Sequence, residues 1–354
     1  MGKPYVSVLI DTYNHERFIE QAITSVLEQD FPANDREVIV IDDGSTDRTG
    51  EIVRKFMPSV CYIYKQNGGQ ASAFNAGIPE CRGELVSFLD GDDWWTPRKL
   101  SRVIPVLAAD SEIGMVGHGN ITMLPDGREF TEVVREGNRL SLRTPEGARL
   151  FRARKSSLGT RTTIRANILK KLLPVPEAIR IEADEFVFTM AAALGDVQIL
   201  GEALFHYRLH PNNFYSQHGF DRSAVSRKQQ YIAQLARSLR ERLTDIGTSA
   251  EVVDIVVESV QVEADQLRLT VERGWPWETV KTELAMYRLL HEDAPWTHRL
   301  FKRAVLLPAC FVPSRVYYGA QRWLVRSDWY KNLRTVVFPV PQPGHLGRSW
   351  KSPS

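Results

Sequence analysis

The first 110 residues alternate short apolar runs with amphipathic segments, and this alternation constrains the fold more than any other feature of the chain. The apolar runs lie at residues 6–10, 38–41, 60–64 and 85–89. Between the first two, apolar side chains recur at helical spacing over 16–29, which predicts a helix packed on a sheet. Strands that alternate with helices form a mostly parallel sheet covered by helices. The sequence therefore predicts an α/β fold.

Capping signals and periodicity predict further elements. Residues 45–47 and the pair Thr96 and Pro97 are typical helix starts, because side-chain oxygens satisfy free N–H groups and proline suits the first turn. The later elements of this part are expected to be strands over 113–124 and 197–207 and a helix over 184–194. They suggest an α+β extension of the same domain.

The composition changes after about residue 220, where long helical stretches begin, at 228–243 and 250–272. The C-terminal end holds four prolines, which are typical of a frayed tail. We therefore predict four parts: an α/β domain over 1–219, a helical extension over 220–295, a basic aromatic amphipathic segment over 296–337 and a flexible tail over 338–354.

Charge and cysteine usage exclude several classes of protein. The 45 basic and 43 acidic side chains leave a net charge of +2, which gives no support to a nucleic-acid partner. Three cysteines without zinc-site spacing exclude a disulfide scaffold and a structural zinc site. The first residues lack the apolar core of a signal peptide, and no stretch approaches the roughly 18 apolar residues of a membrane span. We expect a cytoplasmic protein.

Acidic residues follow three of the four predicted strands, where an open parallel sheet binds its ligands. Asp11 follows the first strand, Asp42 and Asp43 the second, and an Asp-Gly-Asp-Asp motif at 90–93 the fourth; the third ends in Asn-Gly-Gly at 67–69. The glycine-rich motifs that hold phosphates with backbone amides are absent from the sequence. Although Asp and Gly are also common in surface turns, clustered carboxylates indicate a divalent cation that links the protein to substrate phosphates.

Four segments carry a resemblance to a known family. VSVLIDTYNHERFIEQAITSVLEQ, VIVIDDGSTDRT, QNGGQASAFNAGIPECRGELVSFLDGDDWWTPRKL and HYRLHPNN occur in this order. Over residues 5–215, about 60% of the chain, the sequence resembles an inverting family 2 glycosyltransferase with the GT-A fold. The resemblance implies Mn²⁺- or Mg²⁺-dependent transfer of a sugar from a nucleotide diphosphate donor, most often a UDP-sugar, to a saccharide or lipid-linked acceptor in cell-surface polysaccharide or glycolipid assembly.

The resemblance also implies roles for individual residues. Tyr13 would lie against the nucleotide base and Asp43 would hydrogen-bond to it. The full set implied for donor binding is Asp11, Tyr13, Asp43, Asn67, Gly69, Asn75, Asp90 and Arg208. The set implied for the metal is Asp90, Asp92, Asp93 and His210. Structural alternatives stay open, because Asp43 and residues 67–69 also suit turns, Arg208 and His210 suit a strand, and Trp94 and Trp95 suit either a sugar pocket or the core.

An inverting transfer needs a base that removes the acceptor proton, and the candidates are Glu182, Asp184 and Glu185. In the family this base is usually the Asp of a Glu-Asp pair about 11 residues before a glycine, and counting back from Gly195 gives Asp184. This sequence has Ala183 where the Glu is expected and Glu185 directly after Asp184. Glu185 is therefore the alternative base, and simple acidic residues at a helix N-terminus are the structural alternative.

Other functions would require different motifs at the same positions. A dinucleotide-dependent dehydrogenase would need a GxGxxG after the first strand, and a haloacid-dehalogenase-type phosphatase would need an Asp at the position of Ser45. A non-catalytic nucleotide-sugar-binding or assembly protein stays open, because the base motif is altered.

The C-terminal part has a charge pattern of its own. Between residues 298 and 335 there are eight Arg or Lys and one acid, Asp328, interleaved with aromatic and aliphatic side chains. Such segments suit the headgroup region of an anionic membrane but are too short to span it. We expect a peripheral contact at the inner face of the plasma membrane; packing on the catalytic domain or a homo-oligomer contact is the alternative.

Overall fold

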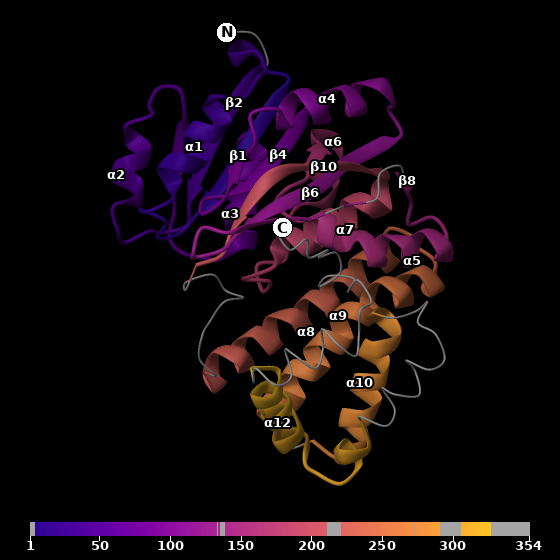
Figure 1. Ribbon diagram of the computed structural model, residues 1–354. Helices are drawn as coiled ribbons and strands as arrows, with labels where there is room; N and C mark the ends of the chain where they lie inside the picture. Colours follow the sequence, from indigo (N-terminus) through magenta and orange to yellow (C-terminus); the bar gives the residue numbers. More distant parts are fainter. Residues whose placement is uncertain are drawn as a thin grey trace, which may run out of the picture.

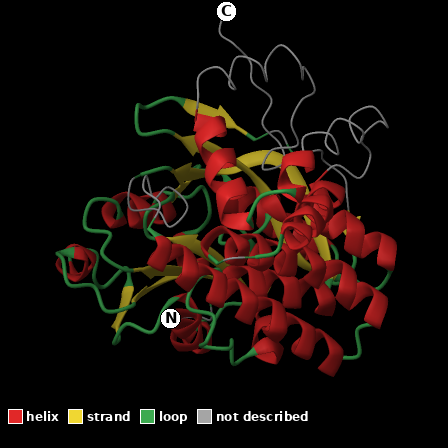
Figure 2. Cartoon of the chain, turned by 90° about the horizontal axis from the view of Figure 1, so that it is seen from below, coloured by secondary structure: helices red, strands yellow, loops and turns green. Residues whose placement is uncertain are grey.

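The computed structural model describes residues 4–132, 134, 139–210, 221–272, 274–290 and 306–326. The N-terminal end lies above the sheet, where β1 (Val6–Thr12) begins, and the C-terminal helices lie below the opposite edge of the sheet (Figure 1). Seen from below, these helices lie in front of the strands (Figure 2). The C-terminal helices are thus on the side toward which the carboxyl ends of the first strands point.

The described strands form one sheet with the order β3-β2-β1-β4-β9-β6-β10-β5, while β7 pairs with β6 and β8 with β10. Besides β1 they are β2 (Arg36–Asp42), β3 (Cys61–Tyr64), β4 (Leu85–Asp90), β5 (Trp94–Trp95), β6 (Ile113–Met123), β7 (Glu129–Thr131), β8 (Arg139–Leu140), β9 (Thr163–Arg165) and β10 (Asp196–Arg208). The first four are parallel, and their register places Asp11 beside Asp90. The predicted mostly parallel α/β sheet is confirmed, including the strands expected over 113–124 and 197–207.

Helices cover both faces of the sheet. They are α1 (Ile19–Leu27), α2 (Thr49–Arg54), α3 (Gln70–Gly77), α4 (Lys99–Ala109), α5 (Pro145–Arg154), α6 (Ala166–Leu172) and α7 (Ala183–Leu194), with short 3₁₀ turns at Ala33–Asp35, Ile78–Glu80, Lys155–Ser157 and Leu307–Cys310. The helices predicted over 16–29, after 45–47, after Thr96 and over 184–194 are confirmed as α1, α2, α4 and α7.

The predicted capping residues are correct for one helix and wrong for another. At α2 the Asp47 carboxylate accepts the backbone N–H of Thr49 at 2.9 Å. At α4 the Thr96 hydroxyl instead donates to the carbonyl of Leu204 at 3.4 Å. The Gln29 side chain, which follows α1, accepts the N–H of Leu100 at 3.0 Å and so satisfies a free donor in the first turn of α4.

The C-terminal part is helical, as predicted for 228–243 and 250–272. Its helices are α8 (Arg222–Asp245), α9 (Ala250–Val271), α10 (Pro276–Leu290) and α12 (Ser314–Arg326). Within the described ranges, none of the helices has the length and apolar character needed to cross a bilayer. Residues 296–305 and 327–337 of the predicted basic segment and the whole predicted tail 338–354 lie outside the described residues.

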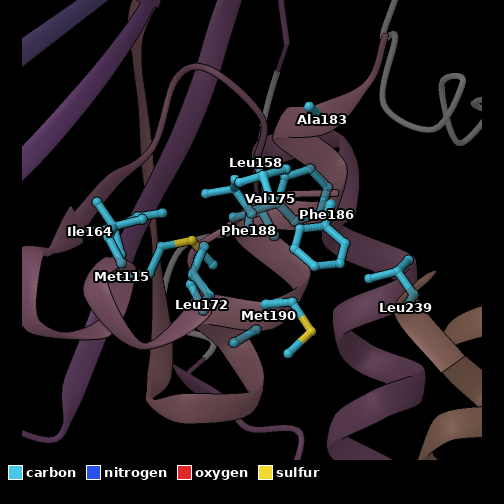
Figure 3. Close-up of a cluster of buried hydrophobic side chains, with 14 of the residues drawn as sticks. Met115, Leu158, Ile164, Leu172, Val175, Ala183, Phe186, Phe188, Met190 and Leu239 are labelled. Atoms are coloured by element: carbon cyan, nitrogen blue, oxygen red, sulfur yellow. The ribbon is translucent and has the colours of Figure 1, made fainter. Parts of the chain in front are cut away.

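One apolar core runs from the sheet through α7 into α8 and α9. Figure 3 shows Phe186 and Met190 of α7 between the sheet residues Met115 and Ile164 and Leu239 of α8. Phe186 is fully buried, and burying one such side chain contributes about 1.5–3 kcal/mol to stability. Helix α7 is therefore fixed from both sides, which matters because its first turn carries Asp184.

Candidate active site

Asp11 and Asp90 form a carboxyl pair at the carboxyl edge of the sheet. They are neighbours in the register of β1 and β4. Burial, then the charges of Asp184 and Asp92, raise the pKa of Asp11 to about 7. Burial and the charges of Asp11 and Asp92 raise the pKa of Asp90 as well, and Thr160 donates to Asp90 at 2.7 Å. Without a cation, both carboxyl groups are therefore expected to hold a proton more readily than a free aspartate does.

The second acidic group is the Asp-Gly-Asp-Asp turn after β4. Ligand oxygens of Asp90, Asp92 and Asp93 all lie within 4.8 Å of one another. Asp93 is buried, and burial with the charges of Asp92 and Asp90 raises its pKa. Such close, poorly hydrated oxygen ligands repel one another unless a cation lies between them. The residues present therefore fit a hard divalent ion such as Mn²⁺ or Mg²⁺.

His210 lies beside this cluster. Its Nε2 lies 3.0 Å from Asp92 Oδ2. Burial raises the pKa of Asp92, but the hydrogen bond from His210 and the charges of His15 and His210 outweigh it, so the pKa is lowered. Asp92 is therefore the member of the cluster whose ionised form the protein favours.

Arg208 ends β10 and lies behind the acidic turn. Its backbone N–H donates to Asp93 at 2.7 Å and its Nε to the carbonyl of Asp92 at 2.9 Å. The guanidinium also donates to Gln21 at 2.6 Å and lies over the Trp94 ring, 4.3 Å from its centroid. These contacts support the conformation of the acidic turn.

The two tryptophans differ in environment. Trp95 is buried in the core, with the Lys99 Nζ 3.6 Å from its ring centroid. Trp94 is only partly buried and stacks on His206 at 4.5 Å. Trp95 therefore follows the core interpretation, while Trp94 stays accessible beside the acidic turn.

Asp43 holds the loop that follows β3. Its buried carboxylate accepts the backbone N–H groups of Gly68 at 2.9 Å and Gly69 at 2.7 Å, and it pairs with Lys65 Nζ at 2.7 Å. The turn after β2 is instead held by Asp42, which accepts the N–H of Ser45 at 2.7 Å. Asp43 is therefore not the capping residue of that turn.

The predicted residues of the 67–77 stretch contact a different part of the chain. Gly69 has φ +87°, and a Cβ there would lie 2.5 Å from the carbonyl oxygen of Arg180, so only glycine fits. Asn67 accepts from the Arg180 guanidinium at 2.7 Å. Asn75 donates to the carbonyl of Val175 and accepts its N–H, both at 2.8 Å. These side chains hold the segment that leads into α7, and Asn75 makes these bonds away from the acidic cluster.

Tyr13 lies at a surface pocket next to the site. It is 45% exposed, and the pocket has a volume of about 650 Å³, within the usual range for small-molecule sites. The pocket is lined by Tyr13, Asn14, His15, Glu16, Arg17, Phe18, Thr46, Asp47 and His210. His210 thus borders both the pocket and the acidic cluster.

The two candidate bases have opposite surroundings. Burial, then the charges of Asp90 and Glu185, raise the pKa of Asp184 to about 7. Glu185 instead forms an ion pair with Lys155 at 2.8 Å. Asp184 is therefore electrostatically coupled to the acidic cluster, whereas the Glu185 carboxylate is held by Lys155.

Sequence reasoning missed several residues that shape this site. Gln70 accepts the backbone N–H groups of Ala183 and Asp184 at 2.9 and 3.3 Å, and Thr160 bonds to Asp90 as described above. No local motif marks Gln70 or Thr160, because each of their partners lies far away in the sequence. Glu182, the third candidate base in the sequence, lies directly before α7, has φ +58° and pairs with Lys228 of α8 at 3.2 Å.

This α/β sheet, with an acidic turn and a separate carboxylate at its carboxyl edge, defines a GT-A-type glycosyltransferase. The chain matches the model for Glycosyl transferase family 2 over residues 7–154. It is 32% identical over 262 residues to an uncharacterized glycosyltransferase of Nostoc sp., a match that covers 70% of this chain and 78% of the relative. The chain therefore belongs to glycosyl transferase family 2.

Solved structures share the fold. TarS 1–349 of S. aureus, in complex with UDP-GlcNAc, superposes with a TM-score of 0.52 at 18% identity, covering 89% of this chain and 92% of that one. The mannosyltransferase PcManGT of Pyrobaculum calidifontis, in complex with GDP-Man and Mn²⁺, gives a TM-score of 0.50 at 20% identity, with 92% and 86% coverage. At such identities the likeness establishes the GT-A-like architecture, which the sequence predicted.

Proposed function

We propose that this chain is a metal-dependent inverting hexosyltransferase that transfers a sugar from a UDP-sugar to the hydroxyl of a saccharide or lipid-linked acceptor, in cell-surface polysaccharide or glycolipid assembly. The observation that carries the proposal is the placement of Asp184, with its pKa raised to about 7, beside the partly buried cluster of Asp90, Asp92 and Asp93. Asp184 suits removal of a proton, and the aspartate cluster suits a cation that binds a diphosphate.

The acidic cluster would hold the metal and the donor. Asp90, Asp92, Asp93 and His210 supply the oxygen and nitrogen ligands for Mn²⁺ or Mg²⁺, which when bound neutralises the donor diphosphate and the leaving group. Asp11 and Asp90 would contact the ribose side of the donor. The PcManGT complex with GDP-Man and Mn²⁺ supports this arrangement by analogy of fold.

The nucleotide would lie along the loops that follow β1, β2 and β3. Tyr13 offers an exposed ring for stacking, and the Asp43 carboxylate orders Gly68 and Gly69. Asn67 and Asn75 act in this account by holding the neighbouring segment through Arg180 and Val175. The TarS complex with UDP-GlcNAc supports a uridine nucleotide as the first donor to test.

Asp184 would act as the base. It accepts the proton of the acceptor hydroxyl while that oxygen forms a bond to the anomeric carbon, and the bond from that carbon to the diphosphate oxygen breaks. The nucleoside diphosphate leaves with the bonding electrons. Because the acceptor oxygen attacks from the face opposite the leaving group, this single displacement inverts the configuration of the anomeric carbon. A base with a pKa near the working pH combines availability with proton affinity.

A thermal-stability screen tests the proposed donor. We expect one or more UDP-sugars to raise the melting temperature in Mn²⁺ but not in EDTA, because a ligand that binds only the folded state stabilises it; dTDP- and GDP-sugars are run alongside. Release of UDP from the stabilising donor then separates an enzyme from a non-catalytic binding protein, since the latter would be stabilised without turnover. No stabilisation by any nucleotide sugar would contradict the proposal.

We also propose that the C-terminal part makes a peripheral contact with an anionic membrane. Five large apolar side chains there are between 56% and 83% exposed: Trp275, Trp277, Leu307, Phe311 and Val316. The segment with Trp275 and Trp277 contacts the segment 307–316, because the Ser314 hydroxyl lies 3.5 Å from the carbonyl of Trp275. Residues 306–326 contain three Arg and no Asp or Glu. Aromatic and basic residues together suit an anionic headgroup layer.

Vesicle sedimentation tests this contact. The full chain is expected to bind vesicles containing phosphatidylglycerol and to be released by salt, and Trp277→Ser with Phe311→Ser should abolish binding. Leu150→Ser and Ile246→Ser, which remove exposed apolar side chains elsewhere, are the matched controls. If the full chain stays in the supernatant, the membrane contact is wrong; concentration-dependent dimerisation lost in the same double variant would favour a homo-oligomer instead.

A further inference from the structure

The N-terminus of α7 is capped by a residue from another helix. The first N–H groups of a helix have no partner within the helix and need one elsewhere. The side chain of Glu182, which precedes α7, does not cap it but pairs with Lys228. Instead, Gln70 Oε1 accepts the N–H of Ala183 at 2.9 Å and that of Asp184 at 3.3 Å. One amide oxygen therefore holds the backbone of the proposed base.

The same amide reaches the acidic pair on the sheet. Gln70 Nε2 lies 3.5 Å from Asp11 Oδ2, a long hydrogen bond. The two ends of one planar group thus contact the backbone of Asp184 and the carboxylate of Asp11. Because the amide group is planar and rigid, its oxygen and nitrogen tie the position of the Asp184 backbone to that of the Asp11 carboxylate.

The backbone of Gln70 is itself fixed by the loop assigned to the donor. Gln70 follows Gly69, whose N–H is bound by Asp43, and its own N–H donates to the carbonyl of Arg180 at 2.9 Å. A Cβ at position 69 would overlap Arg180, so the two segments are in close contact. The residue therefore links the loop after β3, strand β1 and helix α7.

From these contacts we infer that Gln70 is a positioning residue for the transfer reaction, which sets the Asp184 carboxylate relative to Asp11 and hence to the bound donor. The inference rests on the proposed function, in which Asp184 is the base. Misplacing a catalytic group by about 1 Å can cost on the order of 10²-fold in rate. Gln70 does not touch the reacting atoms in this account and acts only through Asp184 and Asp11.

Two substitutions separate positioning from plain helix capping. Gln70→Leu removes all three side-chain hydrogen bonds, whereas Gln70→Glu keeps an acceptor for the N–H groups of α7 and loses the donor toward Asp11. Gln29→Leu is the matched control, because Gln29 likewise caps a helix with its side-chain oxygen, at Leu100 of α4. Gln70→Leu and Gln29→Leu should each lose about 1 kcal/mol of stability with the lost cap.

The assay is the Mn²⁺-dependent release of UDP from UDP-N-acetylglucosamine, with binding of UDP and Mn²⁺ measured by calorimetry. We expect Gln70→Leu to lower kcat by at least about tenfold and to move the acid limb of the pH–rate profile, while UDP affinity changes less than about threefold. The kcat of Gln70→Glu should lie between that of Gln70→Leu and that of the unmodified protein. Gln29→Leu should keep kcat and the pH profile.

The outcomes distinguish the inference from the proposed function. If Asp184→Asn retains full turnover, or if the unmodified protein releases no nucleotide from any nucleotide sugar, the proposed function fails and the inference with it. If Asp184→Asn is inactive but Gln70→Leu keeps the kcat and pH profile of the unmodified protein, Gln70 is only a structural cap and the positioning role is refuted. Should Gln70→Leu not fold, the comparison of Gln70→Glu with Gln29→Leu decides by the same criteria.

Discussion

Replacing Asp184 by asparagine is expected to inactivate the protein and stabilise it at the same time. A general base contributes about 10²–10⁴-fold to turnover, and asparagine cannot accept the proton. The stability effect follows from the raised pKa, because moving it from 3.8 to about 7 corresponds to on the order of 4 kcal/mol against the ionised form. Asparagine carries no charge and removes this cost, so 4 kcal/mol is the upper limit of the gain.

The raised pKa also determines how the stability difference between Asp184→Asn and the unmodified protein changes with pH. Because the folded state binds the proton of Asp184 more tightly than the unfolded state, the cost is absent below pH 4 and complete above about pH 7. Urea unfolding in EDTA should therefore show Asp184→Asn more stable than the unmodified protein at pH 8, with a gain that shrinks steadily toward pH 5. A variant that is equally or less stable at pH 8, or a difference that does not vary with pH, would refute the electrostatic account of Asp184.

Three further changes test the metal, the alternative base and a buried lysine of the core. Asp92→Asn, like EDTA treatment of the unmodified protein, should abolish UDP release and the metal-dependent thermal shift, and full activity of an EDTA-treated sample would exclude the metal. Glu185→Gln should reduce turnover far less than Asp184→Asn but lose about 1 kcal/mol of stability with the Lys155 ion pair; the reverse ranking in turnover would identify Glu185 as the base. Lys99→Met should leave the stability in urea unchanged or raise it, with a larger gain at low pH, because burial lowers the pKa of Lys99. The Lys99 Nζ lies over the Trp95 ring and has no hydrogen-bond partner in the described part of the chain, and a clear loss of stability would contradict this prediction.

The sheet was predictable where burial leaves a periodic trace. Strands β1, β2 and β4 are buried apolar runs, and α1 and α4 place one apolar face on the sheet. Helix α3 was missed because most of its short sequence of small residues is buried, so no amphipathic period marks it. The very short strands of the antiparallel part of the sheet exist through tertiary pairing and leave no signal of their own.

The site was predictable only as far as its residues lie at strand ends. Asp11, Asp90 and Asp92 stand in local motifs, and the topology of a parallel sheet brings such ends together. Gln70 lies 113 residues before Ala183, so no local pattern reports their contact. The structure also shows that Asn75 is used in backbone hydrogen bonds, which its motif did not reveal.

The anomeric configuration of the product tests the central claim most directly. The protein is incubated with Mn²⁺, an α-linked UDP-sugar selected by the thermal screen and a panel of saccharide and lipid-linked acceptors, and the product is followed by proton NMR. We predict a β-linked product that forms with the unmodified protein and not with Asp184→Asn or in EDTA. An α-linked product, or the same rate of transfer with Asp184→Asn, would contradict a metal-dependent inverting transfer with Asp184 as the base.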